Sequence, residues 1–244
     1  MAVATDRVLV VMPALNEQAS VAAVITHVKQ SLPGMDVLVV DDGSSDDTAA
    51  QARQAGAQVA RLAVNLGVGG AMRTGFRYAV ARGYTVVVQV DADGQHDPDE
   101  VAALLDALED ADIVIGSRFA GKGAYQARGP RKYAMVVLSL VFSRLAKTKL
   151  TDVTSGAKAM GPRAIKLFAG YYPAEYLGDT VESLVMAIRA GLRIKEVPVL
   201  MRERTAGTPS HSPIKSAVYL SRAGLALLLA LVRRRPAIDS SDSA

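Results

Sequence analysis

A chain of 244 residues, half of them hydrophobic, is long enough to bury a full core, and we expect one domain with an appendage. Ordinary Pro and Gly contents exclude global disorder, and the absence of cysteine excludes disulfides, thiolate metal sites and cysteine nucleophiles. Residues 1–119 hold 8 Lys and Arg against 16 Asp and Glu, whereas residues 120–244 hold 20 against 8. The acidic half suits a metal ion and the basic half an anion or an anionic membrane, unless the asymmetry only reflects solvated faces.

The first half alternates short apolar runs with helical patterns. Such alternation predicts an α/β fold in which helices cover both faces of a mostly parallel sheet. Ligands of these sheets bind beyond the carboxyl ends of the strands. The predicted strands are Arg7–Met12, Asp36–Val40, Gln58–Leu62, Thr85–Val90 and Asp112–Gly116, and the predicted helices are Glu17–Ser31, Asp46–Ala55, Gly69–Arg82 and Pro98–Leu108.

Polar residues near the first two strand ends suggest how the next helices begin. We expect Pro13 to end the first strand and Asn16 to cap the helix that follows. Ser44 or Ser45 is expected to cap the second helix, where Asp46 would favour the N-terminal dipole.

The second half is less regular. Its predicted elements are helices at Pro130–Lys147, Pro162–Phe168 and Asp179–Ala190, a strand at Arg193–Leu200, and a long helical pattern at Ser212–Val232 before three arginines. We therefore divide the chain into a folded domain (residues 1–211), an amphipathic helical segment (212–235) and a disordered tail (236–244). The apolar part of the segment, Ala217–Val232, is shorter than the about 20 residues of a membrane span and contains Arg222. It is expected to lie in a membrane interface, on the domain's own core or against a partner.

Two acidic clusters each follow an apolar run, at Asp41–Thr48 and at Asp91–Asp97. Crowded carboxylates repel one another, so a cation or polar ligand is expected among them. In the first cluster, Asp42 can accept hydrogen bonds from a base or ribose, and Gly43 lets the chain turn close to it.

The second cluster carries the chemistry of a metal site. Asp91 and Asp93 can bind a divalent cation that also bridges a diphosphate, and Gln95 adds a neutral oxygen. Oxygen ligands favour Mg²⁺ or Mn²⁺, which would neutralise a departing nucleoside diphosphate. The alternative for this Asp-x-Asp is a solvated turn, and His96 is more simply a hydrogen-bonding residue than a ligand.

The glycines of Asn65–Met72 do not form a dinucleotide fingerprint. Gly67 and Gly69 fit the first two positions of G-x-G-x-x-G, but Met72 occupies the third. We expect a loop that packs close to a nucleotide, with Arg73 on the helix that it opens.

With these motifs, the chain resembles family 2 glycosyltransferases of the GT-A fold, in the branch of dolichol-phosphate mannosyltransferases and bacterial polyprenyl-phosphate glycosyltransferases. The resemblance spans residues 7–205. It implies a Rossmann-like, mostly parallel α/β sheet flanked by helices, here followed by C-terminal amphipathic helices. The matching segments are Pro13–Glu17, Asp41–Thr48, Asn65–Gly67, Asp91–His96, Gly116–Phe119 and Asp152–Gly156.

The resemblance implies roles by position. The metal ligands would be Asp91, Asp93 and Gln95. The catalytic residues would be Asp93, Arg118 and Arg131, with both arginines facing the acceptor phosphate, and Glu182 as base for a hydroxyl acceptor. The donor would be bound by Pro13, Ala14, Glu17, Val40, Asp42, Asp91, Ala92 and Arg204.

One departure concerns the acceptor side. In the mannosyltransferases a lysine closely follows the glycine that corresponds to Gly207, but here the next lysine is Lys215.

The implied function is metal-dependent, inverting transfer of a sugar from a GDP- or UDP-linked donor, most simply to polyprenyl (undecaprenyl or dolichyl) phosphate. A lipid phosphate is already an oxyanion and needs no base, whereas a sugar hydroxyl would need Asp179 or Glu182. The chain lacks a signal peptide pattern, so we expect a cytoplasmic protein, peripheral on the inner face of the membrane, where a membrane protein is a possible partner.

Other functions stay open. They are transfer to a sugar hydroxyl in cell-envelope polysaccharide synthesis, a sugar-1-phosphate nucleotidyltransferase and a non-catalytic nucleotide-sugar-binding subunit. Nucleic acid is not an expected partner, because 8 Tyr, 4 Phe and no Trp make a poor stacking platform.

Overall fold

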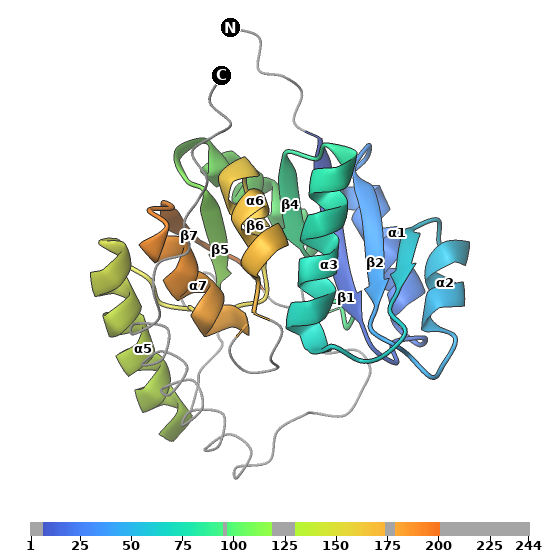
Figure 1. Ribbon diagram of the computed structural model, residues 1–244, viewed down its shortest axis with the longest axis horizontal. Helices are drawn as coiled ribbons and strands as arrows, with labels where there is room; N and C mark the ends of the chain where they lie inside the picture. The colour runs from blue at the N-terminus through green and yellow to red at the C-terminus, as the bar shows by residue number, and fades with distance from the viewer. Residues whose placement is uncertain (1–6, 95–96, 119–129, 174–178, 201–244) are drawn as a thin grey trace, which may run out of the picture.

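The computed structural model describes residues 7–94, 97–118, 130–173 and 179–200 (Figure 1). The segment 212–235 and the tail 236–244 that the sequence distinguishes lie outside the described residues. Among the described helices, none is long and apolar enough to cross a membrane.

A seven-stranded sheet has the order β3-β2-β1-β4-β6-β5-β7. Every pairing is parallel except those of β6, which runs antiparallel to both of its neighbours. The carboxyl ends of the other six strands therefore share one edge of the sheet. The strands are β1 (Val8–Ala14), β2 (Asp36–Asp41), β3 (Gln58–Arg61), β4 (Val86–Gln89), β5 (Ile113–Ser117), β6 (Lys158–Met160) and β7 (Ile194–Pro198).

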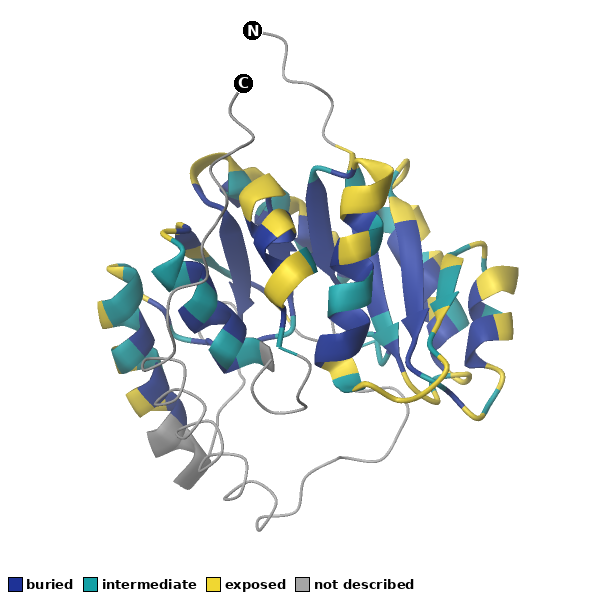
Figure 2. Cartoon of the chain, in the orientation of Figure 1, coloured by how far each residue is buried: buried dark blue, intermediate teal, exposed yellow. Residues whose placement is uncertain are grey.

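Helices cover both faces of the sheet, and the strands between them are buried (Figure 2). On one face, α1 (Val21–Ser31), α2 (Thr48–Gln54) and α4 (Val101–Asp106) contribute to one apolar core. On the other, a second core takes residues from α3 (Gly67–Arg82), α5 (Pro130–Ala146), α6 (Pro162–Tyr171) and α7 (Asp179–Arg189). Short 3₁₀ turns, η1 (Pro98–Glu100) and η2 (Ala107–Asp110), flank α4.

Strand β1 shows how the sequence serves both cores at once. Leu9 and Val11 belong to the α3 side, while Val10 and Met12 belong to the α1 side, and all four are fully buried. Because successive side chains point to opposite faces, a strand between two helical layers needs a continuous apolar run.

The strand order reverses beside β1. From β1 the chain proceeds outward to β2 and β3, and it then returns to place β4 on the other side of β1. Such a switch point leaves a crevice beyond the carboxyl ends of the strands, where open α/β sheets bind ligands. The loops that follow β1, β2 and β4 meet this crevice.

Most predicted elements are confirmed within two or three residues, apart from the first helix, which begins four residues later at Val21. The helix expected at Pro98–Leu108 is divided into η1, α4 and η2. The prediction missed β6, whose three residues are too few to show a period.

The expectation that Pro13 ends β1 is wrong, because Pro13 lies inside the strand and pairs with Val40. Alternate residues of a strand bond to opposite neighbours, and the N–H of Val90 bonds to the carbonyl of Val11. Residues 11 and 13 therefore both face β4. Since β4 ends at Gln89, opposite Val11, the missing N–H of Pro13 removes no bond between strands.

The helix caps also differ from the prediction. Asn16 does not cap α1, which begins at Val21, and neither Ser44 nor Ser45 caps α2. The N–H of Thr48 instead bonds to Oδ1 of Asp46, at 3.0 Å.

Candidate active site

The loops after β1 and β2 are joined by hydrogen bonds from three successive backbone N–H groups. The N–H of Asn16 bonds to Ser44 Oγ at 2.9 Å, and that of Glu17 to Thr48 Oγ1 at 2.8 Å. The N–H of Gln18 bonds to Asp46 Oδ2 at 3.2 Å. The polar residues that follow β2 thus hold the loop after β1 in place, and these two loops form one wall of the crevice.

Asn16 makes the return contact. Its Oδ1 accepts the N–H of Ser45 at 2.9 Å, and its backbone is left-handed, with φ of 56°. Asparagine tolerates this conformation better than most residues. The side chain expected to cap a helix therefore joins two loops.

Asp46 is held as a carboxylate. Partial burial raises its pKa, but the hydroxyl and N–H of Thr48 and the N–H of Gln18 outweigh this, so the pKa lies below the ordinary value of 3.8. Hydrogen bonds to the charged form are the physical cause.

The two aspartates at the end of β2 have different partners. Asp41 is fully buried, accepts the N–H of Ser44 at 2.9 Å and forms an ion pair with Arg61 at 3.2 Å. Asp42 accepts the N–H groups of Leu66 and Gly67 at 2.7 and 2.8 Å. Asp42 thereby ties β2 to the first turn of α3, where a helix dipole favours a negative charge.

Burial raises the pKa of Asp42 above 3.8, the bonds from Leu66 and Gly67 lower it, and Asp41 raises it again. The net shift is upward. Each carboxylate oxygen can accept a second hydrogen bond, so these amides leave acceptor capacity for a ligand.

Gly43 permits the close approach of these loops. It has φ of 78°, and a Cβ there would lie 3.0 Å from backbone atoms of Val64 and Asn65. Only glycine combines this conformation with this contact at low cost, so the tight turn expected at this residue is confirmed.

Asp91 and Asp93 occupy the turn that follows β4, at the switch point. Both are half-buried, and Gln89 Nε2 donates to Asp91 Oδ1 at 3.3 Å. Gly94 continues the turn with φ of 76°. Two carboxylates on one turn are the hard oxygen donors that Mg²⁺ and Mn²⁺ prefer, so the residues present fit such an ion. Gln95 lies outside the described residues.

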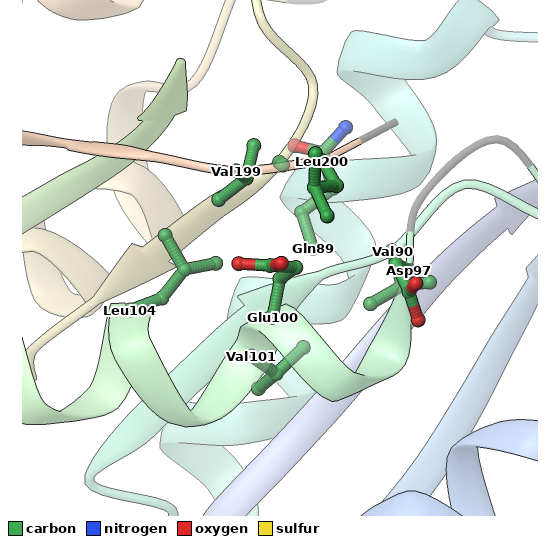
Figure 3. Close-up of a pocket in the computed structure, with 9 residues that line it drawn as sticks. Gln89, Val90, Asp97, Glu100, Val101, Leu104, Val199 and Leu200 are labelled. Atoms are coloured by element: carbon green, nitrogen blue, oxygen red, sulfur yellow. The ribbon is translucent and has the colours of Figure 1, made fainter. Parts of the chain in front are cut away.

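A small pocket lies behind this turn, on the α4 side of the sheet (Figure 3). Val101 and Leu104 of α4 face Val199 and Leu200 across it, and Glu100 projects between them. Asp91 and Asp93 do not line it. Its largely apolar wall does not suit a diphosphate, so we assign it no part in the metal site.

A second group of possible metal ligands comprises His27, Asp97 and Asp99. Their contacts are internal: Asp99 accepts the hydroxyl of Ser31 at 2.5 Å and lies 3.9 Å from His27, while Asp97 accepts the N–H of Asp99 at 3.2 Å. These bonds attach η1 to α1, which is a structural role.

Arg118 directly follows β5 and is held by Asp152. Its Nε and Nη2 donate to the two oxygens of Asp152 at 2.6 and 2.8 Å, and Nη2 also donates to Thr154 at 3.0 Å. Asp152 is fully buried, and the Arg118 side chain is 14% exposed. A bidentate pair of this kind fixes the plane of a guanidinium. The sequence placed Asp152 in a matching motif but did not reveal this role.

The remaining predicted donor residues that the structure describes fall into two groups. Val40 and Ala92 are buried, so any contact that they make with a donor would be through the backbone. Pro13, Ala14 and Glu17 lie at the end of β1 and in the loop after it, where Glu17 accepts the hydroxyl of Ser20 at 2.7 Å.

Glu182 is half-buried in the first turns of α7, which begins at the strand-end edge of the sheet (Figure 1). Arg131 lies in the first turn of α5. Arg204 lies outside the described residues.

Comparisons with known proteins agree with this geometry. The model of the family "Glycosyl transferase family 2" matches residues 9–167. The chain is 36% identical to an undecaprenyl-phosphate mannosyltransferase of Micrococcus luteus, over 90% of this chain and 95% of that protein. It is 31% identical to a polyprenol monophosphomannose synthase of Mycolicibacterium smegmatis, over 88% and 85% respectively.

Among solved structures, the fold is similar to that of glucosyl-3-phosphoglycerate synthase from Mycobacterium tuberculosis, crystallised with Mn²⁺, uridine diphosphate and phosphoglyceric acid. The TM-score is 0.72 at 24% identity, over 96% of this chain and 81% of that chain. This likeness confirms the fold class expected from the sequence. Another crystal structure of that enzyme, in complex with Mg²⁺ and uridine diphosphate, has a TM-score of 0.70 at 23% identity, over 93% of this chain and 80% of that chain.

Proposed function

Because the chain belongs to glycosyl transferase family 2, we propose that it transfers a sugar from a nucleoside-diphosphate sugar to polyprenyl phosphate, with inversion at the anomeric carbon. The observation that carries the proposal is the position of Asp91 and Asp93, on the turn beyond β4 where the strand order reverses. A ligand in this crevice meets the loops after β1, β2 and β4 together.

The donor half rests on these three loops. Asp91 and Asp93 would hold Mg²⁺ or Mn²⁺, and the bound ion would neutralise the charge that develops on the leaving diphosphate. The bonds from Asn16 and Glu17 hold the loop after β1 against the loop after β2, and the N–H of Asp42 bonds to the carbonyl of Ala14 at 2.9 Å. This wall would hold the nucleoside of either a GDP- or a UDP-linked sugar, with Asp42 accepting from the base or ribose.

The acceptor half of the proposal rests on two relatives and on two arginines, one at the end of the acidic half and one in the basic half. Of the two relatives above, one is named an undecaprenyl-phosphate mannosyltransferase and the other a polyprenol monophosphomannose synthase. Arg118 and Arg131 would face the acceptor phosphate, and the bond to Asp152 leaves the Nη1 side of Arg118 directed away from that carboxylate. Arginine suits this task because its planar group matches phosphate oxygens in pairs.

The chemical step follows from these placements. An oxygen of the acceptor phosphate attacks the anomeric carbon from the face opposite the diphosphate. The bond from this carbon to the diphosphate oxygen breaks, and the nucleoside diphosphate departs with the electron pair. The attacking oxygen carries no proton near pH 7, so the protein aligns the reactants and removes none. A lipid acceptor places the reaction at a membrane surface, on the inner face where nucleotide sugars are available.

Donor titration tests the metal assignment. We expect binding of a UDP- or GDP-sugar that requires Mg²⁺ or Mn²⁺, and in Asp93→Asn we expect this binding to weaken by about tenfold or more, because one anionic ligand is lost. Calorimetry of each donor with and without metal measures this. Asp106→Asn, which removes an exposed carboxylate on α4, is the matched control. Equal metal-dependent donor affinity in Asp93→Asn and wild type would refute the assignment.

A further inference from the structure

Glu196 of β7 is a carboxylate that the proposed reaction does not use. It accepts three hydrogen bonds from two consecutive residues of the loop between α5 and β6. The N–H groups of Thr151 and Asp152 donate to Oε2 at 2.7 and 2.9 Å, and the hydroxyl of Thr151 donates to Oε1 at 2.5 Å. Both oxygens of Glu196 are thus directed at one short piece of backbone.

That piece of backbone carries the partner of Arg118. Asp152 is fully buried and bonds Arg118 through its two oxygens, one of which also accepts the backbone N–H of Arg118 at 3.1 Å. A hydrogen-bonded path therefore runs from Glu196 through Thr151 and Asp152 to the guanidinium. A second branch joins the hydroxyls of Thr151 and Ser117, 2.8 Å apart, immediately before Arg118.

Besides the ion pair with Arg118, the hydroxyl contacts that join this loop to α5 are neutral. Ser139 of α5 donates to the carbonyl of Thr151 at 3.0 Å, and Ser143 both donates to and accepts from the backbone of Leu150. Glu196 supplies charge-assisted bonds, which are about twice as strong as neutral ones. Glu196 therefore constrains the position of Asp152 more strongly than Ser139 or Ser143 does.

We propose that Glu196 is a positioning residue for the acceptor site: it fixes the Thr151–Asp152 backbone so that Asp152 presents Arg118 to the acceptor phosphate. This inference rests on the proposed lipid-phosphate acceptor. It assigns Glu196 no contact with substrate. Displacing residue 152 would turn the guanidinium plane, and the anomeric carbon and phosphate oxygen would lose alignment.

Kinetics with separate donor and acceptor saturation give the first test. In Glu196→Ala we expect kcat/KM for polyprenyl phosphate to fall by about tenfold to a hundredfold, as for other residues that orient a ligand-binding group, while donor KM changes less than twofold. Glu196→Gln should recover most of the loss. Its carbonyl can accept both backbone N–H groups, and its amide can donate to the Thr151 hydroxyl, which then turns toward Ser117.

Lys195→Ala is the matched control, because it alters the neighbouring residue of β7, whose contact with Asp110 at 3.4 Å is exposed. If Glu196→Ala does not fold, Thr151→Val replaces it. This variant removes only the hydroxyl bonded to Glu196 and Ser117, and it should shift acceptor kcat/KM in the same direction by a smaller factor.

A spectroscopic readout separates this inference from the proposed function. Nitrogen-15 NMR reports the Arg118 Nε–H, assigned by its loss in Arg118→Lys, and the bond to Asp152 should slow its exchange with water. We expect faster exchange in Glu196→Ala and near wild-type exchange in Glu196→Gln and Lys195→Ala. Unchanged exchange and unchanged acceptor kinetics in a folded Glu196→Ala would overturn the inference. Absence of transfer to polyprenyl phosphate by the wild type would overturn the proposed function, and the exchange result would still stand.

Discussion

Asp41 and Asp42 are neighbours in the chain, but their carboxylates bond to different groups. Asp41 pairs with Arg61 across the end of β3, while Asp42 accepts the first amides of α3. The apolar run before them predicts their place at a strand end. Arg61, Leu66 and Gly67 each lie 20 or more residues from the aspartate that they contact, and no local pattern indicates which carboxylate meets which of these groups.

The same limit applies to Arg118. Its basic character predicts an anion nearby, and the structure supplies a buried one, Asp152. The pair depends on a loop 34 residues further along the chain, which the sequence marks only as a motif. Residue types were therefore predictable at the site, whereas the bonds between them were not.

Asp46 gives a prediction of pH dependence. Its folded-state pKa lies below 3.8, so the stabilisation that its carboxylate provides is present above that pH and is lost as the pH falls through the lowered value. At pH 7 we expect Asp46→Ala to lower the free energy of unfolding by about 1 kcal/mol, as the loss of a helix cap does. This corresponds to a fall in Tm of about 2–4 °C. Thermal unfolding from pH 7 to 2 measures the difference.

The difference in Tm between wild type and Asp46→Ala should become smaller below pH 3.8, because Asp46 of the wild type then becomes protonated. Asp106→Ala, which removes an exposed carboxylate, is the control. A difference that stays constant down to pH 2 would contradict the assigned role of the Asp46 charge.

At the scale of elements, strands with both faces buried were the most predictable. Their Val- and Leu-rich runs distinguish β1, β2, β4 and β5 from the helices. Strand β6 was not predicted, because three residues are too few to show a period. Its antiparallel place between β4 and β5 is set by tertiary packing. Pro13 was misinterpreted for a related reason, since a proline is tolerated in a strand wherever the neighbouring strand has already ended.

Helix α3 packs closely on β1 through Gly75. A Cβ at this position would lie 2.5 Å from Cγ1 of Val11, which is fully buried and rotationally stiff. We expect overpacking in Gly75→Ala to lower the free energy of unfolding by about 1–3 kcal/mol. The higher helix propensity of alanine offsets up to about 1 kcal/mol of this loss. Urea unfolding measures the net loss.

Gly170 in α6 is the control for this change, because a Cβ there meets nothing within 4 Å. Gly170→Ala should be neutral or should stabilise the protein by up to about 1 kcal/mol. Equal behaviour of the two variants would show that the contact between α3 and β1 does not need the glycine.

Across the whole molecule, the acidic and basic halves of the chain supply different residues to the proposed site. Residues 1–119, with 8 basic and 16 acidic side chains, contain the proposed metal ligands, most of the proposed donor residues and Arg118. Residues 120–244, with 20 and 8, contain Arg131, Glu182 and Arg204. The fold and the family followed from the sequence because strand ends, acids and motifs are local signals. The proposed acceptor site depends on residues that meet only in three dimensions, among them Arg118, Asp152 and Glu196.

The basic half leads us to expect binding to anionic lipid. The chain should sediment with vesicles of phosphatidylglycerol and phosphatidylcholine, and less with phosphatidylcholine alone, with binding that weakens as salt rises. Replacing Arg233, Arg234 and Arg235 by Gln should weaken binding by about a hundredfold, because each charge near the surface contributes about 1 kcal/mol.

Arg163→Gln with Arg193→Gln is the control, because both side chains pair with Asp112 at the start of β5, on the edge opposite the site. Equal binding to vesicles with and without phosphatidylglycerol would show that the basic side chains do not attract the protein to anionic lipid.

Sugar transfer to a lipid phosphate can be measured directly with purified protein. Purified protein is incubated with Mg²⁺ or Mn²⁺, polyprenyl phosphate and each of a set of UDP- and GDP-sugars, and the organic phase is assayed for glycosyl phosphate, whose anomeric configuration is read by NMR. We predict a metal-dependent lipid-linked product, from at least one donor, with the anomeric configuration opposite to that of the donor. Transfer to a soluble sugar hydroxyl but never to polyprenyl phosphate, or a product that retains the donor's configuration, would contradict the account.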